Sequence, residues 1–234
     1  MNLFWSVNVP YIHLFDFHHM LYISLMLLTL FILLYYRKFV KIHSEKIRKS
    51  ILVTSIGQQV LLYSWYIFEL GFDMAESLPF HISRISSLLG IYYLLTKNRR
   101  VLNVLFFFGL YAYGSFLYPS LVYPFYHAVG ISFLINHVIT ILLPFFAAIA
   151  YDWKPTFKSL IVAYGYFLLY FTFVYFFNPL VDGNYFYLKH RPFFSHWSDA
   201  VYIPVVLIAT FTLFLTGFGV FKGIEKRLLN KVNS

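Results

Sequence analysis

The stretch YHAVGISFLINHVITILLPFFAAIA (Tyr126–Ala150) decides the class of fold, because it holds no Asp, Glu, Lys or Arg over its whole length. A helix of about 20 such residues crosses a hydrocarbon core of ~30 Å. Lipid offers no hydrogen-bond partner to open backbone groups, so a run of this kind must be helical. The stretch therefore predicts a transmembrane helix.

Comparable apolar runs recur along the chain, and we predict further spans over residues 18–36, 50–71, 78–96, 101–118, 158–178 and 200–221. The sequence is 60% hydrophobic and only 12% charged, with a mean hydropathy of +0.70. A soluble domain carries roughly a quarter charged residues, so this composition excludes one. The short alternating segments of a transmembrane barrel are missing as well. We predict an all-α, polytopic seven-helix bundle over residues 18–222, preceded by an outer interfacial segment (1–17) and followed by a basic cytoplasmic tail (223–234).

The basic residues predict how the bundle is oriented in the membrane. Fifteen of the 18 fall in alternate loops and the tail: Arg37, Lys38, Lys41, Lys46, Arg48, Lys49, Lys97, Arg99, Arg100, Lys154, Lys158, Lys222, Lys226, Arg227 and Lys231. Loops rich in Lys and Arg stay on the cytoplasmic side. We therefore expect the N-terminus outside and the C-terminus in the cytoplasm. Topology also accounts for the net charge of +9, so no nucleic-acid partner is predicted.

Polar residues lie on single faces of three predicted spans, as the helical advance of 100° per residue shows. They are Ser55, Gln58, Gln59, Tyr66 and Glu69 in the second span, His81 and Arg84 in the third, and Asn136, His137 and Thr140 in the fifth. Ionisable groups inside a bilayer are costly and usually face a cavity, a partner or a substrate. We predict a polar cavity in the outer half of the bundle, with Asn184 and Tyr185 at its entrance.

The opposite face of the third span carries only small residues: Ser83, Ser86, Ser87 and Gly90. Small residues let helices approach closely, so this stripe is interpreted as a packing seam. Cysteine is absent, which excludes disulfides, thiolate metal sites and cysteine nucleophiles. The histidines match no metal-ligand spacing. We predict neither a metal nor a cofactor.

Each candidate residue has a functional and a structural interpretation. His137 suits a general base, with Asn136 stabilising an oxyanion and Ser83 or Thr140 offering a hydroxyl. The structural alternatives are a helix-to-helix hydrogen bond for His137 and bonds to backbone carbonyls for the hydroxyls. Arg84, with its guanidinium fork, suits an anionic headgroup. Its structural alternatives are an ion pair with Glu69 and snorkelling to the outer headgroups. The remaining predicted substrate-binding residues are His81, Gln58, Gln59, Glu69, Asn184 and Tyr185.

Several segments of the chain are distinctive: ESLPFHIS (Glu76–Ser83), LTKNRR (Leu95–Arg100), Pro119 in an outer loop, NHVI (Asn136–Ile139), YDWKPTFKSL (Tyr151–Leu160) and GNYFYLKHRP (Gly183–Pro192). Together they resemble the bacterial YwaF-like integral membrane proteins. The resemblance runs from about residue 16 to 215. That family is grouped with seven-span acyltransferases that move fatty acyl chains between phospholipids with a Cys and a His. The resemblance implies a seven-helix bundle, with His137 matching the mid-span His and His81 the Leu-Pro-x-His element.

The cysteine of those relatives does not carry over, since bacterial members commonly have it at the position of Ser83. A hydroxyl nucleophile, a direct transfer activated by His137, and no catalysis at all therefore stay open. We predict a multi-pass bacterial plasma-membrane protein that acts on membrane phospholipid, as a lipid acyltransferase or lipid hydrolase. The alternative is a non-enzymatic transporter or a substrate-binding membrane subunit for a small amphiphile or anion.

Overall fold

The computed structural model describes residues 3–225, and every long apolar run in this part is a helix. The helices are α1 (Phe17–Tyr35), α2 (Arg37–Ile42), α3 (Ser44–Phe68), α4 (Ile82–Thr96), α5 (Arg99–Phe108), α6 (Leu110–Leu117), α7 (Ala128–Tyr151), α8 (Phe157–Val181), the 3-10 turn η1 (Tyr185–Tyr187) and α9 (Asp199–Ile224). Lys226, Arg227 and Lys231 of the predicted tail lie outside the described residues. No strand occurs between residues 3 and 225.

Six helical segments in the described chain are long and apolar enough to cross a membrane: α1, α3, the pair α5–α6, α7, α8 and α9. The predicted third span is shorter than expected, because α4 has only 15 residues and begins at Ile82 rather than at 78. Pro79 disfavours helix at Leu78, the residue before it, and the backbone of His81, which precedes the first helical residue, is extended. Fifteen residues of helix span about 22 Å, less than a hydrocarbon core.

Two other boundaries differ from the prediction. The basic segment 37–49, expected to be a loop, is helical: it forms α2 and the first turns of α3, which begins at Ser44 instead of residue 50. Charge does not prevent helix formation at a membrane surface, so hydropathy alone misses these turns. The predicted fourth span is divided at Gly109 into α5 and α6. A Cβ on Gly109 would lie 3.0 Å from Cγ2 of Thr140, so glycine allows the close contact with α7.

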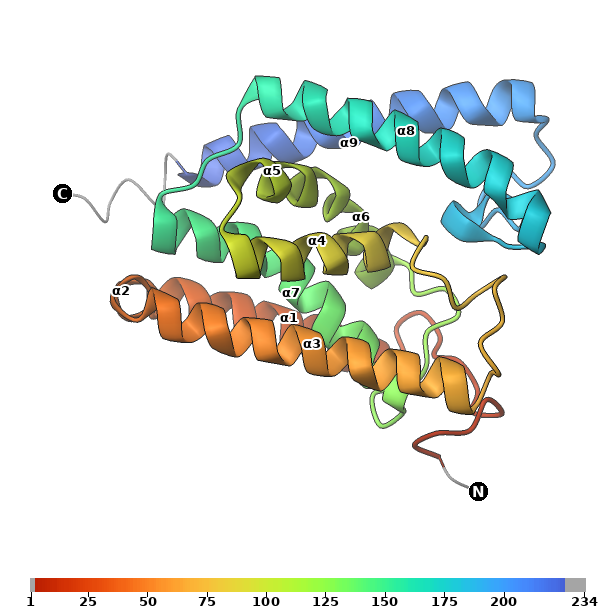
Figure 1. Ribbon diagram of the computed structural model, residues 1–234, viewed down its shortest axis with the longest axis horizontal. Helices are drawn as coiled ribbons and strands as arrows, with labels where there is room; N and C mark the ends of the chain where they lie inside the picture. Colours follow the sequence, from red (N-terminus) through yellow and green to blue (C-terminus); the bar gives the residue numbers. More distant parts are fainter. Residues whose placement is uncertain (1–2, 226–234) are drawn as a thin grey trace.

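The helix α7 lies at the centre of the bundle and touches each of α1 to α6 (Figure 1). In an apolar stretch of 18 residues within α7, 61% of the residues are buried, against 11% in the corresponding stretch of α9. The helices α8 and α9 pack together, and α8 contacts α5 on the side away from α3 (Figure 1). The small-residue stripe of α4 packs as predicted, because Gly90 meets Leu143 of α7 and Ser87 meets α3.

The connections between the helices gather at the two ends of the bundle (Figure 1). The basic end, at the left of the picture, carries α2, the turn from α4 to α5, and the link from α7 to α8. The loop end, at the right, carries residues 3–16, 69–81, 118–127 and 182–198. Residues 3–16 close the loop end, since the amide of Ala128 and the indole of Trp65 donate to the carbonyls of Phe4 and Trp5.

Candidate functional site

Arg84, in the first turn of α4, is the centre of a buried polar cluster at the loop end. Its side chain is 10% exposed. One guanidinium nitrogen donates to the Glu76 carboxylate at 2.7 Å and to the Tyr66 hydroxyl. The other donates to the carbonyl of Leu78 at 3.0 Å and to that of Glu76. Arg84 thus binds the loop 69–81 back onto its own helix.

The acidic partner of Arg84 is Glu76, which corrects the suggested pairing with Glu69. Glu69 instead accepts a hydrogen bond from the amide of Val7 at 3.4 Å, in the N-terminal segment. The reason is geometric: Glu69 ends α3, whereas Glu76 sits in the loop that folds over Arg84. Sequence analysis missed Glu76 as a site residue, although it begins the ESLPFHIS segment.

Glu76 also contacts His81, with 3.3 Å between its second carboxylate oxygen and Nε2 of the imidazole. Burial raises the pKa of Glu76, but the hydrogen bond from His81 and the charge of Arg84 outweigh it. The net effect lowers the pKa of Glu76 to about 2. The carboxylate therefore stays ionised at neutral pH and holds its two basic neighbours.

Tyr185, expected at a substrate entrance, is fully buried and ties the same loop to α8. Its hydroxyl donates to the Met74 carbonyl at 2.6 Å and accepts from the Leu78 amide at 3.1 Å. Its backbone exchanges two hydrogen bonds with the side chain of Asn178. Asn184 accepts from the amides of Lys189 and His190, at 3.0 and 2.9 Å. Both residues shape loops in this structure, and their contact with substrate stays a prediction.

A second polar group, here called the glutamine cluster, joins α3, α4 and α7. It consists of Gln58, Gln59, Ser87 and Ser132. The amide of Gln58 donates to Ser132 at 2.6 Å. The amide of Gln59 donates to Ser87 at 2.8 Å and to Gln58 at 2.7 Å. Of the residues predicted on one face of α3, Gln58 and Gln59 therefore bond to neighbouring helices. Ser55 instead donates to the Ile51 carbonyl of its own helix. Ser132 could have been found from its position one turn before Asn136 on the same helix.

Asn136 and His137 lie mid-way along α7 and face different neighbours. Asn136 donates to the backbone carbonyl of Ser83 at 3.3 Å and accepts from Thr140 at 3.5 Å. It therefore meets Ser83 through the backbone and not through the hydroxyl. Asn136, His137 and Thr140 are 7%, 5% and 4% exposed.

The hydrogen bond of His137 fixes which of its nitrogens is basic. Nδ1 lies 2.8 Å from the carbonyl oxygen of Phe133. A carbonyl only accepts, so Nδ1 carries the proton and Nε2 keeps its lone pair. Among residues 3–225, Nε2 has no hydrogen-bond partner. The ring lies between Phe133 of α7 and Phe116 of α6, with centroids at 4.1 and 6.1 Å.

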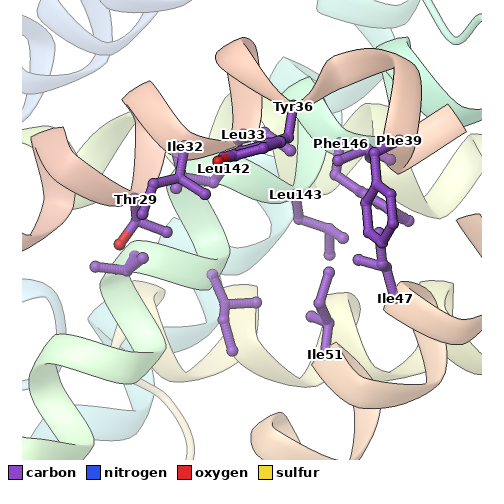
Figure 2. Close-up of a pocket in the computed structure, with 13 residues that line it drawn as sticks. Thr29, Ile32, Leu33, Tyr36, Phe39, Ile47, Ile51, Leu142, Leu143 and Phe146 are labelled. Carbon is purple, nitrogen blue, oxygen red and sulfur yellow. The ribbon is translucent and has the colours of Figure 1, made fainter. Parts of the chain in front are cut away.

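A separate apolar cavity of about 540 Å³ lies toward the basic end, between α1, α2, α3 and α7 (Figure 2). Its α7 wall includes Val138, Leu142 and Phe146. On a helix that advances 100° per residue, the centre of this wall is rotated by roughly 140° from the face of Asn136 and His137. The cavity and His137 therefore belong to opposite sides of α7.

Comparison with known protein families shows to which family the chain belongs. Residues 14–221 match the TMEM164 family. The chain belongs to the TMEM164 family. The match begins just before α1 and ends within α9, so it includes the Arg84 cluster, the glutamine cluster and His137. This is a multi-pass membrane protein. No curated protein and no solved structure matches the chain.

Proposed function

We propose that the protein crosses the bacterial plasma membrane seven times, with the N-terminus outside and the C-terminus in the cytoplasm. Residues 3–16 lie at the loop end and α9 ends at the basic end, which agrees with an odd number of crossings (Figure 1). In this proposal α4, together with residues 78–81, crosses the membrane in addition to the six long helical segments. It is the third crossing along the chain. The lysines and arginines of the basic end then face the cytoplasm.

We further propose that the protein is a phospholipid acyltransferase or lipid hydrolase in which His137 is the general base. The observation that carries this proposal is the unprotonated, unpartnered Nε2 of an imidazole buried among aromatic rings. A structural histidine normally uses both nitrogens. In the described residues the fully buried side-chain atoms without a partner are Nδ1 of His18 and Oγ of Ser77, so Nε2 of His137 is not sealed off from its surroundings. The resemblance to YwaF-like proteins supports the same class of reaction.

In the proposed reaction, the hydroxyl of a lysophospholipid attacks the acyl carbonyl of a donor phospholipid. His137 Nε2 takes the hydroxyl proton as the new oxygen–carbon bond forms. The bond between the acyl carbon and the donor glycerol oxygen then breaks, and His137 returns the proton to that leaving oxygen. Water in place of the lysophospholipid gives hydrolysis. This direct transfer is favoured over a protein nucleophile, because no Ser or Thr hydroxyl of residues 3–225 hydrogen-bonds His137.

The neighbours of His137 have positioning roles in this proposal. Asn136 supplies an amide donor to the oxyanion, exchanging its 3.3 Å bond to the Ser83 carbonyl for the substrate. Thr140 orients that amide through its hydroxyl. His81 lies nearest the headgroup, whereas Arg84 acts indirectly, because its donors are used by Glu76, Leu78 and Tyr66.

The alternative is a non-enzymatic protein that binds or transports a small amphiphile or anion. The apolar cavity favours it, since a preformed concave site of this size holds a ligand without chemistry. The same experiment separates the two proposals.

The test uses purified protein in phospholipid vesicles supplied with a labelled lysophospholipid, followed by lipid mass spectrometry. The variant is His137→Gln, and the matched control is His43→Gln. His43 has the same local geometry, with Nδ1 3.1 Å from the Phe39 carbonyl and 4.1 Å between ring centroids, but it lies at the basic end. We expect label in diacyl lipid or free fatty acid with wild type and His43→Gln only. Equal transfer by His137→Gln would refute the base. If no label moves in any sample while lipid co-purification depends on His137, the binding protein is favoured.

A further inference from the structure

The cavity at the basic end has an apolar base and an exposed rim. Its base is formed by Leu142, Leu143 and Phe146 of α7, which are at most 6% exposed. Its rim is formed by Ile32 of α1, Phe39 of α2 and Tyr36 between the two helices, which are about half exposed. Figure 2 shows these side chains converging on one space from three helices. The opening therefore faces the surroundings of the bundle and not its interior.

The lining holds two hydroxyl groups, those of Thr29 and Tyr36, and its other residues are apolar. The hydroxyl of Thr29, at one edge, already donates to the Leu25 carbonyl at 2.7 Å. Specific sites for polar ligands place a few hydrogen-bonding groups in the wall. A hydrocarbon chain needs none, because it contacts an apolar wall by dispersion alone, as lipid tails contact a membrane helix. The chemistry of the wall thus selects an acyl chain.

The short helix α2 covers the basic end of the cavity and divides its residues between two faces. Tyr36, Phe39 and Val40 line the cavity. Arg37, Lys38 and Lys41 fall on the other side of the helix, by the advance of 100° per residue. In Figure 1, α2 is seen end-on while α1 and α3 run across the picture, so α2 lies across the bundle axis. An amphipathic helix with this orientation and a basic face is typical of the lipid headgroup level.

The charge beside the cavity identifies the headgroup. Lys38 is exposed, while Lys41 bridges to Asp152 at 3.2 Å. Basic residues next to a membrane attract anionic lipids, and neutral headgroups gain nothing from them. We propose that this cavity binds one acyl chain of an anionic phospholipid, with its phosphate held at the basic face of α2. The site is independent of the acyl-transfer proposal, because it lies on the opposite side of α7 from His137.

The experiment titrates the purified full-length protein in detergent with dioleoyl phosphatidylglycerol or dioleoyl phosphatidylcholine and counts bound lipid by native mass spectrometry. Ile32→Trp obstructs the rim. Its matched control is Ile161→Trp on α8, since both isoleucines are 47% exposed. Lys38→Gln removes one charge, and its control is Lys158→Gln, an exposed lysine at the start of α8. Thermal unfolding of each variant verifies that it is folded.

We expect one phosphatidylglycerol to bind more tightly than phosphatidylcholine. Lys38→Gln should weaken it about fivefold, the effect of one basic residue near a headgroup. Ile32→Trp should weaken it at least about tenfold, because several CH₂ groups lose their contacts. Both controls should bind as wild type does. Equal affinity for the two lipids, or unchanged binding by folded Ile32→Trp, would overturn the proposal. If Ile32→Trp loses this lipid but still transfers acyl chains, the result supports the lipid site and does not affect the proposed role of His137.

Discussion

The pairing of Arg84 with Glu76 can be measured by a double-mutant cycle. The variants are Arg84→Met, Glu76→Gln and the two together. Arg84→Met removes a cation that is 10% exposed and leaves the carbonyls of Glu76 and Leu78 without their donor. A hydrogen bond to a charged group contributes about 1.5–3 kcal/mol, and breaking a fully buried pair costs about 3–5 kcal/mol.

The Glu76 side chain is 45% exposed, so the lower part of these ranges applies. We expect Arg84→Met to cost about 3 kcal/mol, since it affects four hydrogen bonds at once. Glu76→Gln should cost about 1–2 kcal/mol. The coupling energy should be about 1–2 kcal/mol, because the cycle isolates only the interaction between the two side chains.

The assay is reversible unfolding in mixed detergent micelles, followed by far-ultraviolet circular dichroism. The matched control is Lys189→Gln, which breaks an ion pair with Asp182 in the exposed loop after α8. No resolvable change is expected there, since solvent screens that pair. Additive effects of Arg84→Met and Glu76→Gln, within about 0.3 kcal/mol, would show that the two residues act independently and would refute their pairing.

Two further predictions concern the same fold. The fold lowers the pKa of Glu76 from its ordinary value of 4.5 to about 2. The ionised carboxylate therefore contributes its full stabilisation above pH 4.5, and this contribution is lost as the pH falls toward 2. The unfolding midpoint should drop between pH 4.5 and 2.5, and Glu76→Gln should flatten that drop; an unchanged pH profile would contradict it. Gly130→Ala would place a Cβ 2.0 Å from the Pro124 carbonyl oxygen, so it should destabilise by about 3 kcal/mol. Gly165→Ala should leave the stability unchanged, because no atom lies within 4 Å of the added Cβ. Equal stability changes in the two variants would contradict the close contact between Gly130 and Pro124.

Hydropathy predicted the existence of the long helices, because lipid requires continuous apolar segments. Their ends followed local chemistry that hydropathy does not measure. Pro79 disfavoured helix at Leu78, and the lysines of residues 37–49 were compatible with helix at a membrane surface. The break falls at Gly109, where an added Cβ would meet Thr140, a residue 31 positions further along the chain. Such a contact is set by tertiary packing and leaves no signal in a hydropathy profile.

Helical periodicity identified the polar face of α3, with Gln58 and Gln59 on one side. It could not identify their partners, because Ser87 and Ser132 come from other helices. The choice between Glu69 and Glu76 shows the same limit. Both carboxylates precede Arg84 at the loop end, and only the path of residues 69–81 decides which one reaches it. Helical periodicity therefore predicts on which face of a helix a residue lies, whereas the path of the loops determines which residue it contacts.

His43 and His137 show why surroundings and not local geometry should decide function. Each donates through Nδ1 to the carbonyl four residues earlier and packs its ring on the phenylalanine at that position. The shared arrangement leaves Nε2 as the basic nitrogen in both. Of the two, His137 is the buried one, at 5% exposure, and Asn136, the next residue in the chain, carries the amide that the proposal assigns to the oxyanion. A difference in activity between the two glutamine variants would therefore come from burial and from that neighbouring amide, since the imidazoles themselves are held alike.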